Sequence, residues 1–111
     1  MSLAAPSADA TVVVTGASSG IGLEIARGLA QRGYPLTLVA RRRERLDDLA
    51  DELRRDHQVT VEIAPVDLSD SVARGELLHR LQGRQLAGLV NSAGFGTHGP
   101  FQSLPWGRER D

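Results

Sequence analysis

The chain has 111 residues, a formal net charge of −1 and no cysteine. This length fits one domain, the charge argues against nucleic acid or a membrane surface as the main partner, and the missing cysteine excludes disulfides, thiolate metal sites and a cysteine nucleophile. No stretch approaches the ~20 apolar residues of a membrane helix. The start of the chain shows no signal peptide, so we expect a cytoplasmic protein.

Residues 1–10 are expected to form a loose leader, and residues 11–111 to form part of one domain. The continuous apolar run at residues 12–14 predicts a strand buried on both faces. Four apolar residues then fall on one face of a predicted helix: Ile21, Ile25, Ala26 and Leu29. Gly33 is a plausible C-cap for that helix.

A second buried strand is predicted at residues 36–40, and a third, half-exposed strand at Val59, Val61 and Ile63, which alternate with polar residues. Between them, four residues have the spacing of an amphipathic helix: Leu46, Leu49, Ala50 and Leu53. A third helix is predicted to begin after Ser69 as its N-cap. It would carry the apolar residues Val72, Leu77, Leu78 and Leu81. Residues 86–90 predict a fourth strand.

This alternation of strands and helices predicts an α/β fold with a parallel sheet and helices on its faces. Right-handed crossovers limit the topology to a doubly wound, Rossmann-like sheet. We expect the strand order 3-2-1-4, a partial form of the dinucleotide-binding arrangement. The half-exposed third strand fits the outer edge.

Three glycines lie where the first predicted strand turns into the first helix: Gly16, Gly20 and Gly22. In an open α/β sheet, ligands bind at the carboxyl ends of the strands, where a helix N-terminus offers free N–H groups to a phosphate. Glycine lets the backbone approach the phosphate because no Cβ intervenes. We therefore predict a phosphate-binding turn, with a simple tight turn as the alternative. It is not a P-loop, because no Gly-Lys-Ser/Thr follows.

The stretch "TGASSGIG", residues 15–22, resembles the cofactor motif T-G-x-x-x-G-x-G of the short-chain dehydrogenase/reductase family. "NSAG", residues 91–94, resembles the family's N-N-A-G motif, and Asp67 in "PVDLSD" matches its Asp near the adenine. The resemblance covers the chain from Thr11 onward. It departs from the pattern at Ser92, which replaces the second Asn, a residue that helps to support the central sheet in this family.

The residues after the second predicted strand indicate which dinucleotide binds. NAD-dependent enzymes normally have an acidic residue there for the ribose 2′-OH, but this chain has Ala40, followed by Arg41 and Arg42. Arginine can bind a 2′-phosphate through paired charge-assisted hydrogen bonds, so we predict NADP(H) as cofactor. The alternative is a solvated helix start, which we favour for Arg43 and Arg45.

Further cofactor contacts are predicted, each with a structural alternative. Ser18 and Ser19 would bind ribose or phosphate, or satisfy the turn backbone. Ile21 would pack beside the pyrophosphate or in the core. Asp67, with Leu68 beside it, would contact the adenosine, or Asp67 would cap the third helix. The NSAG residues would contact the cofactor or form a strand-end turn: Asn91, Ala93 and Gly94.

In the family that the chain resembles, hydride transfer depends on a Ser and a Tyr-x-x-x-Lys arrangement. All 13 basic residues here are Arg, and the single Tyr, Tyr34, follows the first helix, so no residue takes a catalytic role. We expect the NADP(H)-binding front part of a truncated oxidoreductase that interconverts a carbonyl and an alcohol. The alternative is a non-catalytic NADP-binding module. A fourth strand without a further neighbour predicts self-association.

Overall fold

The computed structural model describes residues 5–18 and 20–92, and within them strands and helices alternate as the sequence predicts. The strands are β1 (Ala10–Thr15), β2 (Leu36–Ala40), β3 (Val61–Pro65) and β4 (Gln85–Asn91). The helices are α1 (Gly20–Gln31), α2 (Arg43–His57) and α3 (Ser71–Leu81).

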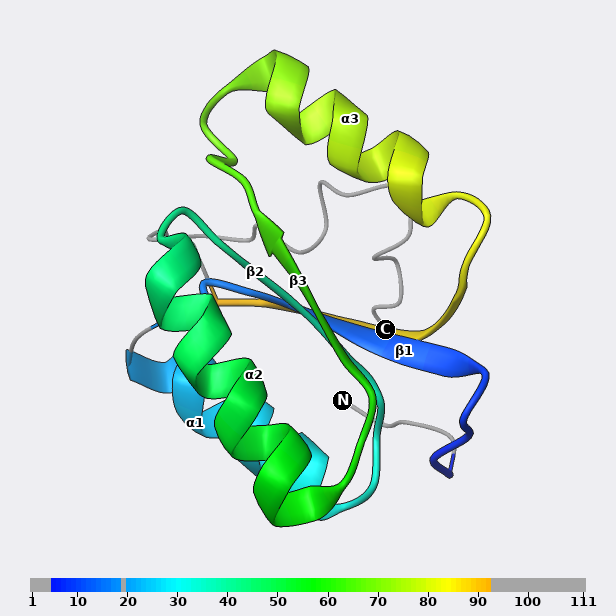
Figure 1. The fold of residues 1–111 in the computed structure, drawn as a ribbon. Helices are drawn as coiled ribbons and strands as arrows, with labels where there is room; N and C mark the ends of the chain where they lie inside the picture. Colours follow the sequence, from blue (N-terminus) through cyan, green and yellow to red (C-terminus); the bar gives the residue numbers. More distant parts are fainter. Residues whose placement is uncertain (1–4, 19, 93–111) are drawn as a thin grey trace.

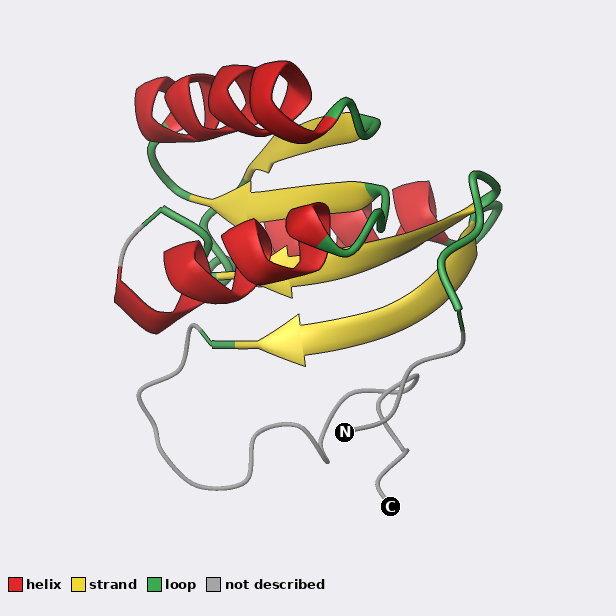
Figure 2. Ribbon diagram, turned by 90° about the horizontal axis from the view of Figure 1, so that it is seen from below, coloured by secondary structure: helices red, strands yellow, loops and turns green. Residues whose placement is uncertain are grey.

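The four strands form one parallel sheet in the order β3-β2-β1-β4, which confirms the predicted topology. Val14 of β1 pairs with Leu38 of β2 on one side and with Val90 of β4 on the other. Parallel neighbours need crossover connections, and Figures 1 and 2 show α1 and α2 on one face of the sheet and α3 on the other. The carboxyl ends of all four strands therefore meet at one edge, where this architecture binds ligands.

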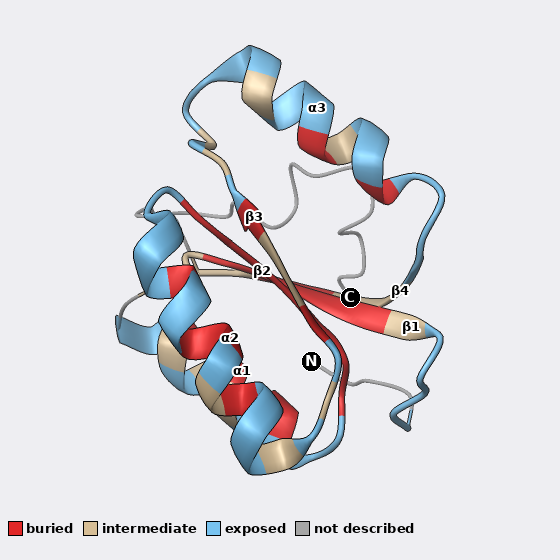
Figure 3. Ribbon diagram, viewed as in Figure 1, coloured by how far each residue is buried: buried red, intermediate tan, exposed pale blue. Residues whose placement is uncertain are grey.

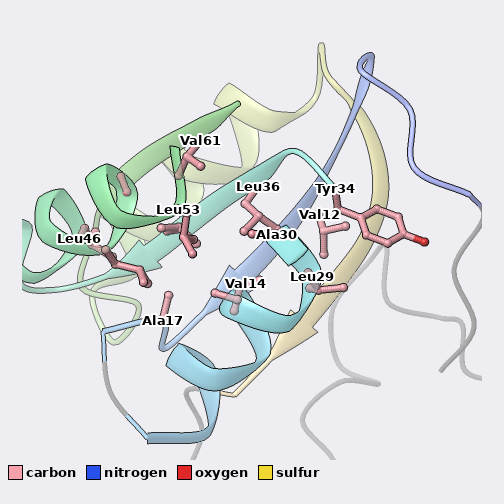
Figure 4. Close-up of a cluster of buried hydrophobic side chains, with 14 of the residues drawn as sticks. Val12, Val14, Ala17, Leu29, Ala30, Tyr34, Leu36, Leu46, Leu53 and Val61 are labelled. Atoms are coloured by element: carbon pink, nitrogen blue, oxygen red, sulfur yellow. The ribbon is translucent and has the colours of Figure 1, made fainter. Parts of the chain in front are cut away.

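The face covered by α1 and α2 holds the larger of two apolar cores (Figure 4). Leu46 and Leu53 of α2 are fully buried there, together with Leu36 of β2. Burial of each such leucine contributes roughly 1.5–3 kcal/mol. The ring of Tyr34 is also buried, and its hydroxyl points away from the cluster (Figure 4). The aliphatic core that the composition predicts is therefore present.

The face covered by α3 holds a smaller core. Successive side chains of a strand point to opposite faces, so Val13 of β1 points towards α3 while its neighbours point towards α1 and α2. Leu77 and Leu81 are the buried residues of α3, and both lie in its second half (Figure 3). The first half of α3 is consequently exposed along most of its length.

The C-terminal end of α1 follows the prediction for Gly33. This glycine has φ 92°, in the left-handed region that side chains avoid. The N–H of Tyr34 donates to the Leu29 carbonyl, and the N–H of Gly33 donates to the Ala30 carbonyl. These two bonds form a Schellman motif, which satisfies carbonyls that the helix leaves free.

Three apolar residues lie where the periodicity did not predict them. Ile21 of α1 is 73% exposed and Val72 of α3 is 69% exposed, so neither belongs to a core. Both residues stand in the first turn of their helices, and their exposure shows that these two side chains do not pack on the sheet. Val59 precedes β3 rather than lying in it, although it packs against the larger core. The predicted edge position of β3 is confirmed.

An ion-pair cluster connects α1 to α2. Arg27 donates two hydrogen bonds to the Glu52 carboxylate, from Nε at 2.8 Å and from Nη2 at 3.0 Å, and a third to Glu24 at 2.9 Å. The bonds from Arg27 hold the pKa of Glu52 below its usual value, against the opposing effect of partial burial. Glu52 therefore links the two helices as a carboxylate.

Replacing Glu52 with glutamine should lower the melting temperature near neutral pH and have little effect in acid. A carboxylate with a depressed folded-state pKa stabilises the fold above its unfolded-state pKa, and this contribution is lost as the pH falls through the folded value. Melting curves of the native chain and Glu52→Gln should therefore converge below about pH 4. Glu24→Gln is the control, since it removes the same charge from a more exposed partner of Arg27. A pH-independent difference, or an equal effect of the control, would contradict this role.

Candidate functional site

The turn between β1 and α1 takes a conformation that requires glycine. Gly16 has φ 67° and Gly20 has φ 58°, both in the left-handed region. Between them Ala17 is fully buried, and its N–H donates to the Val39 carbonyl at 3.2 Å. This bond fixes the turn against the end of β2.

Gly22 is required for a different reason, which is the close approach of α1 to the ends of β1 and β4. A Cβ built on Gly22 would collide with the carbonyl oxygen of Gly16 and with Oγ of Ser92. Gly22 itself is buried. The glycine motif thus brings the N-terminus of α1 directly onto the carboxyl edge of the sheet.

The N-terminus of α1 has the properties of an anion-binding site. Its first turn contains no acidic residue that would neutralise the partial positive charge of the helix. Gly20 is exposed, and the space where its side chain would be is open. The unpaired N–H groups of a first helical turn can therefore be reached by a phosphate.

A cleft of about 440 Å³ lies at the carboxyl edge of the sheet, beside the glycine turn. The residues that line it come from the turn and from the ends of β2, β3 and β4: Gly16, Ser18, Val39, Ala40, Arg41, Val66, Asp67, Leu68, Ser69 and Ser92. The cleft unites five residues that the sequence predicts as a site: Gly16, Ser18, Arg41, Asp67 and Leu68. The other lining residues were not predicted as site residues: Val39, Ala40, Val66, Ser69 and Ser92.

The remaining predicted site residues do not line this cleft. Gly20 and Ile21 line a second, more open hollow of about 530 Å³ along the first half of α1. The exposure of Ile21 rules out the core alternative for this residue. Gly22, Arg42 and Asn91 do not line either hollow: Gly22 lies in the first turn of α1, Arg42 precedes α2 and Asn91 ends β4. Ser19, Ala93 and Gly94 lie outside the described residues.

The carboxylate of Asp67 is held in the cleft by Ser69. Oδ1 of Asp67 accepts one hydrogen bond from the Ser69 N–H at 2.9 Å and another from the Ser69 hydroxyl at 2.7 Å. These bonds lower the pKa of Asp67, and the positive charge of Arg41 acts in the same direction. Asp67 therefore presents a fixed negative charge opposite Arg41.

The helix cap predicted in this segment lies at another residue. Asp70 is the N-cap of α3, and its Oδ1 accepts from the N–H groups of Val72 at 2.9 Å and Ala73 at 3.3 Å. Neither Ser69 nor Asp67 caps the helix, because their side chains bond to each other. Asp67 is thus free of the capping role and remains available to the cleft.

The two arginines after β2 occupy different positions. Arg41 is exposed and lines the cleft. Arg42 is the N-cap residue of α2, with an extended backbone and no capping bond from its side chain. Nε of Arg43 lies 3.8 Å from Oδ2 of Asp47, one helical turn later in α2. Arg41 is consequently the best placed of the three to contact an anion in the cleft.

The ends of β1 and β4 are connected by polar side chains that the sequence did not predict as a unit. The Thr15 hydroxyl donates to Oδ1 of Asn91 at 2.9 Å, and the Ser92 hydroxyl donates to the Thr15 carbonyl oxygen. Ser92, the departure from the N-N-A-G pattern, therefore does contact the central strand. Asn91 is positioned by Thr15, which ends β1 and is the first residue of the TGASSGIG motif.

The described residues contain no group of three or more His, Cys, Asp or Glu side chains placed to hold a metal ion. In the same part of the chain, no helix combines the length and the apolar character needed to cross a bilayer. The cleft instead offers one cation, one carboxylate, three hydroxyl groups and apolar walls. This set suits a ligand that carries both an anionic group and a polar ring.

Comparison with known proteins identifies the family. Residues 10–107 match the family model of short chain dehydrogenase. The chain is 35% identical over 105 residues to a very-long-chain 3-oxoacyl-CoA reductase of Danio rerio (93% of this chain, 33% of that protein) and 41% identical over 86 residues to sulfoacetaldehyde reductase 2 of Chromohalobacter salexigens (76% and 33%). It superposes with a TM-score of 0.75 and 41% identity on a short-chain dehydrogenase from Sphingobium yanoikuyae in complex with NADPH, covering 86% of this chain and 38% of that one.

The chain thus spans about a third of the length of the curated relatives that it matches. The glycine turn, the strand order and the cleft at the carboxyl edge agree with these matches. The chain belongs to the short-chain dehydrogenase family.

Proposed function

We propose that the chain binds NADP(H) in the cleft at the carboxyl edge of the sheet, as the cofactor-binding part of an oxidoreductase that interconverts a carbonyl and an alcohol. The observation that carries this proposal is the position of Arg41, which lines the cleft and directly follows Ala40, the residue that stands where an NAD enzyme has an acid. The NADPH complex of the relative from Sphingobium yanoikuyae supports it.

The residues of the cleft fit the parts of such a cofactor. The glycine turn and the N-terminus of α1 would bind the pyrophosphate through backbone N–H groups. Arg41, with Arg42 beside it, would bind the 2′-phosphate. Asp67 and Leu68 would contact the adenosine, and Asn91 would lie towards the nicotinamide. Ser18 in the turn would also contact the cofactor, as would three residues outside the described part of the chain: Ser19, Ala93 and Gly94.

The bound nicotinamide would supply or accept the hydride. The chain itself has no lysine, and Tyr34 lies between α1 and β2, at the amino ends of the strands and away from the cleft. We therefore expect the chain alone to bind cofactor without turning over a carbonyl substrate. A non-catalytic NADP-binding module is the second candidate, and the same absence of lysine favours it.

We also propose that the chain associates with a second copy of itself. β4 stands at one end of the sheet formed by the described residues, and Leu86, Ala87 and Gly88 in it are half-buried. A strand with an unpaired edge and apolar neighbours is a template for association.

Fluorescence titration of the purified chain with NADPH and NADH tests the cofactor proposal. NADPH should bind ten- to a hundredfold more tightly, because a charge-assisted hydrogen bond contributes about 1.5–3 kcal/mol and 1.4 kcal/mol corresponds to about tenfold. Competition by 2′,5′-ADP but not by 5′-ADP would locate the preference at the 2′-phosphate. Equal affinities, or no binding of either nucleotide, would contradict the proposal.

A further inference from the structure

The strand β3 stands at the end of the sheet opposite β4, with one side of its backbone facing away from β2. The carbonyl of Thr60 accepts the N–H of Leu36 in β2 at 2.9 Å. Backbone groups of successive strand residues point to alternate sides, so the carbonyls of Val61 and Ile63 point outward. An edge of this kind offers free groups to any further strand.

Two arginines occupy these outward carbonyls from opposite faces of the sheet. Nη2 of Arg54, on α2, donates to the Val61 carbonyl at 2.5 Å, and Nη2 of Arg80, on α3, donates to the Ile63 carbonyl at 3.3 Å. Figure 1 shows α2 and α3 on either side of β3. The acceptors at two consecutive outward positions of this edge are therefore already bonded.

Pro65, the next outward residue of β3, and the ion pairs of Glu62 further oppose pairing of a second strand at this edge. Pro65 has no N–H and cannot donate to a further strand. Glu62 on β3 accepts two hydrogen bonds from Arg84, at 2.7 and 2.6 Å, and lies 4.0 Å from Arg80. A second strand laid along β3 would have to displace charged groups that are paired with one another.

We propose that Arg54 and Arg80 close the outer edge of β3 against pairing with a second copy of this chain. The guanidinium groups satisfy the carbonyls that a pairing strand would need, so extension of the sheet along β3 is blocked. Without pairing along β3, association through another surface can close after two chains, whereas an additional open edge allows open-ended assembly. The arginines thus limit the size of any assembly rather than preventing association.

The test compares two double variants of equal charge. Arg54→Met with Arg80→Met removes both guanidinium groups but keeps unbranched side chains along the helices. Arg45→Met with Arg55→Met is the control, because these α2 arginines are exposed and neither donates to a strand carbonyl in the described part of the chain. Sedimentation velocity over a range of concentrations should give the native distribution for the control. The R54M/R80M variant should show a weight-average mass at least about twofold higher that grows with concentration.

Amide hydrogen exchange identifies the edge that pairs. The outward N–H groups of Val61 and Ile63 should become protected in R54M/R80M at high concentration and stay unprotected in the native chain and the control. Unchanged mass, or larger assemblies without protection at these two amides, would overturn the proposal. Thermal melting verifies that each variant is folded. If the double variant is unfolded, sedimentation velocity and hydrogen exchange are measured on the single variants Arg54→Met and Arg80→Met instead, with the same expected and contradicting results.

Discussion

Replacing Gly22 with alanine is expected to abolish NADPH binding and to destabilise the fold by roughly 1–3 kcal/mol, the usual cost of overpacking. The backbone of Gly22 does not have a positive φ, so alanine can adopt its conformation. The cost comes from space alone, because the new methyl group would collide with the backbone carbonyl of Gly16. Either the helix or the turn must move, and both carry the N–H groups proposed to bind the pyrophosphate.

Gly28→Ala is the matched control on the same helix. Gly28 is exposed in α1 and has nothing within 4 Å of its added Cβ, so this change should stabilise the chain by about 0.5–1 kcal/mol and leave NADPH binding unchanged. Urea unfolding and NADPH titration of both variants measure the two effects. Wild-type affinity in Gly22→Ala would show that the close approach of α1 to the turn is not needed for binding.

Replacing Arg41 with alanine is expected to weaken NADPH binding ten- to a hundredfold, the value of one charge-assisted hydrogen bond of about 1.5–3 kcal/mol to a phosphate. NADH, which has no 2′-phosphate, should bind this variant as it binds the native chain. The cleft would then contain Asp67 without its opposing cation. The measurement is the ratio of the two dissociation constants, obtained by fluorescence titration at constant salt.

Arg43→Ala serves as the control for net charge. Arg43 lies two residues further along, is exposed, and pairs with Asp47 on its own helix. If both variants weaken NADPH binding equally, the effect is a general one of positive charge, and the assignment of Arg41 to the 2′-phosphate is wrong. A parallel loss of NADH affinity in Arg41→Ala would instead place Arg41 at a part of the cofactor common to both dinucleotides.

Much of the fold could be predicted because its signals are local. Continuous apolar runs such as residues 12–14 and helical spacing such as that of Leu46 and Leu53 each depend on a few neighbouring residues, and all of these are buried as expected. Ile21 and Val72 were misplaced because their spacing fits the helix period. The period reports which side of a helix is apolar, but not whether that turn of the helix still lies over the sheet.

Prediction of the site was limited in a different way. Asp67, Ser69 and Asp70 are all residue types that cap helices, and the sequence does not decide which of them bonds to the backbone and which to another side chain. The structure assigns the cap to Asp70 and pairs the other two. Thr15 and Ser92 are 77 positions apart in the chain, so their contact depends on strand order, which only the assembled sheet provides.

The unequal cores on the two faces of the sheet have a consequence for the cleft. α3 buries Leu77 and Leu81 near its end, whereas α2 buries four residues along its length. Segments with few buried contacts open at lower free energy than the rest of a domain. Asp67, Leu68 and Ser69 lie in the connection between β3 and α3, so we expect one wall of the cleft to open at lower free energy than the face covered by α2. Any ligand that binds this wall would stabilise the folded form of this segment by mass action. Local order around α3 would then depend on the fraction of chains with ligand bound in the cleft.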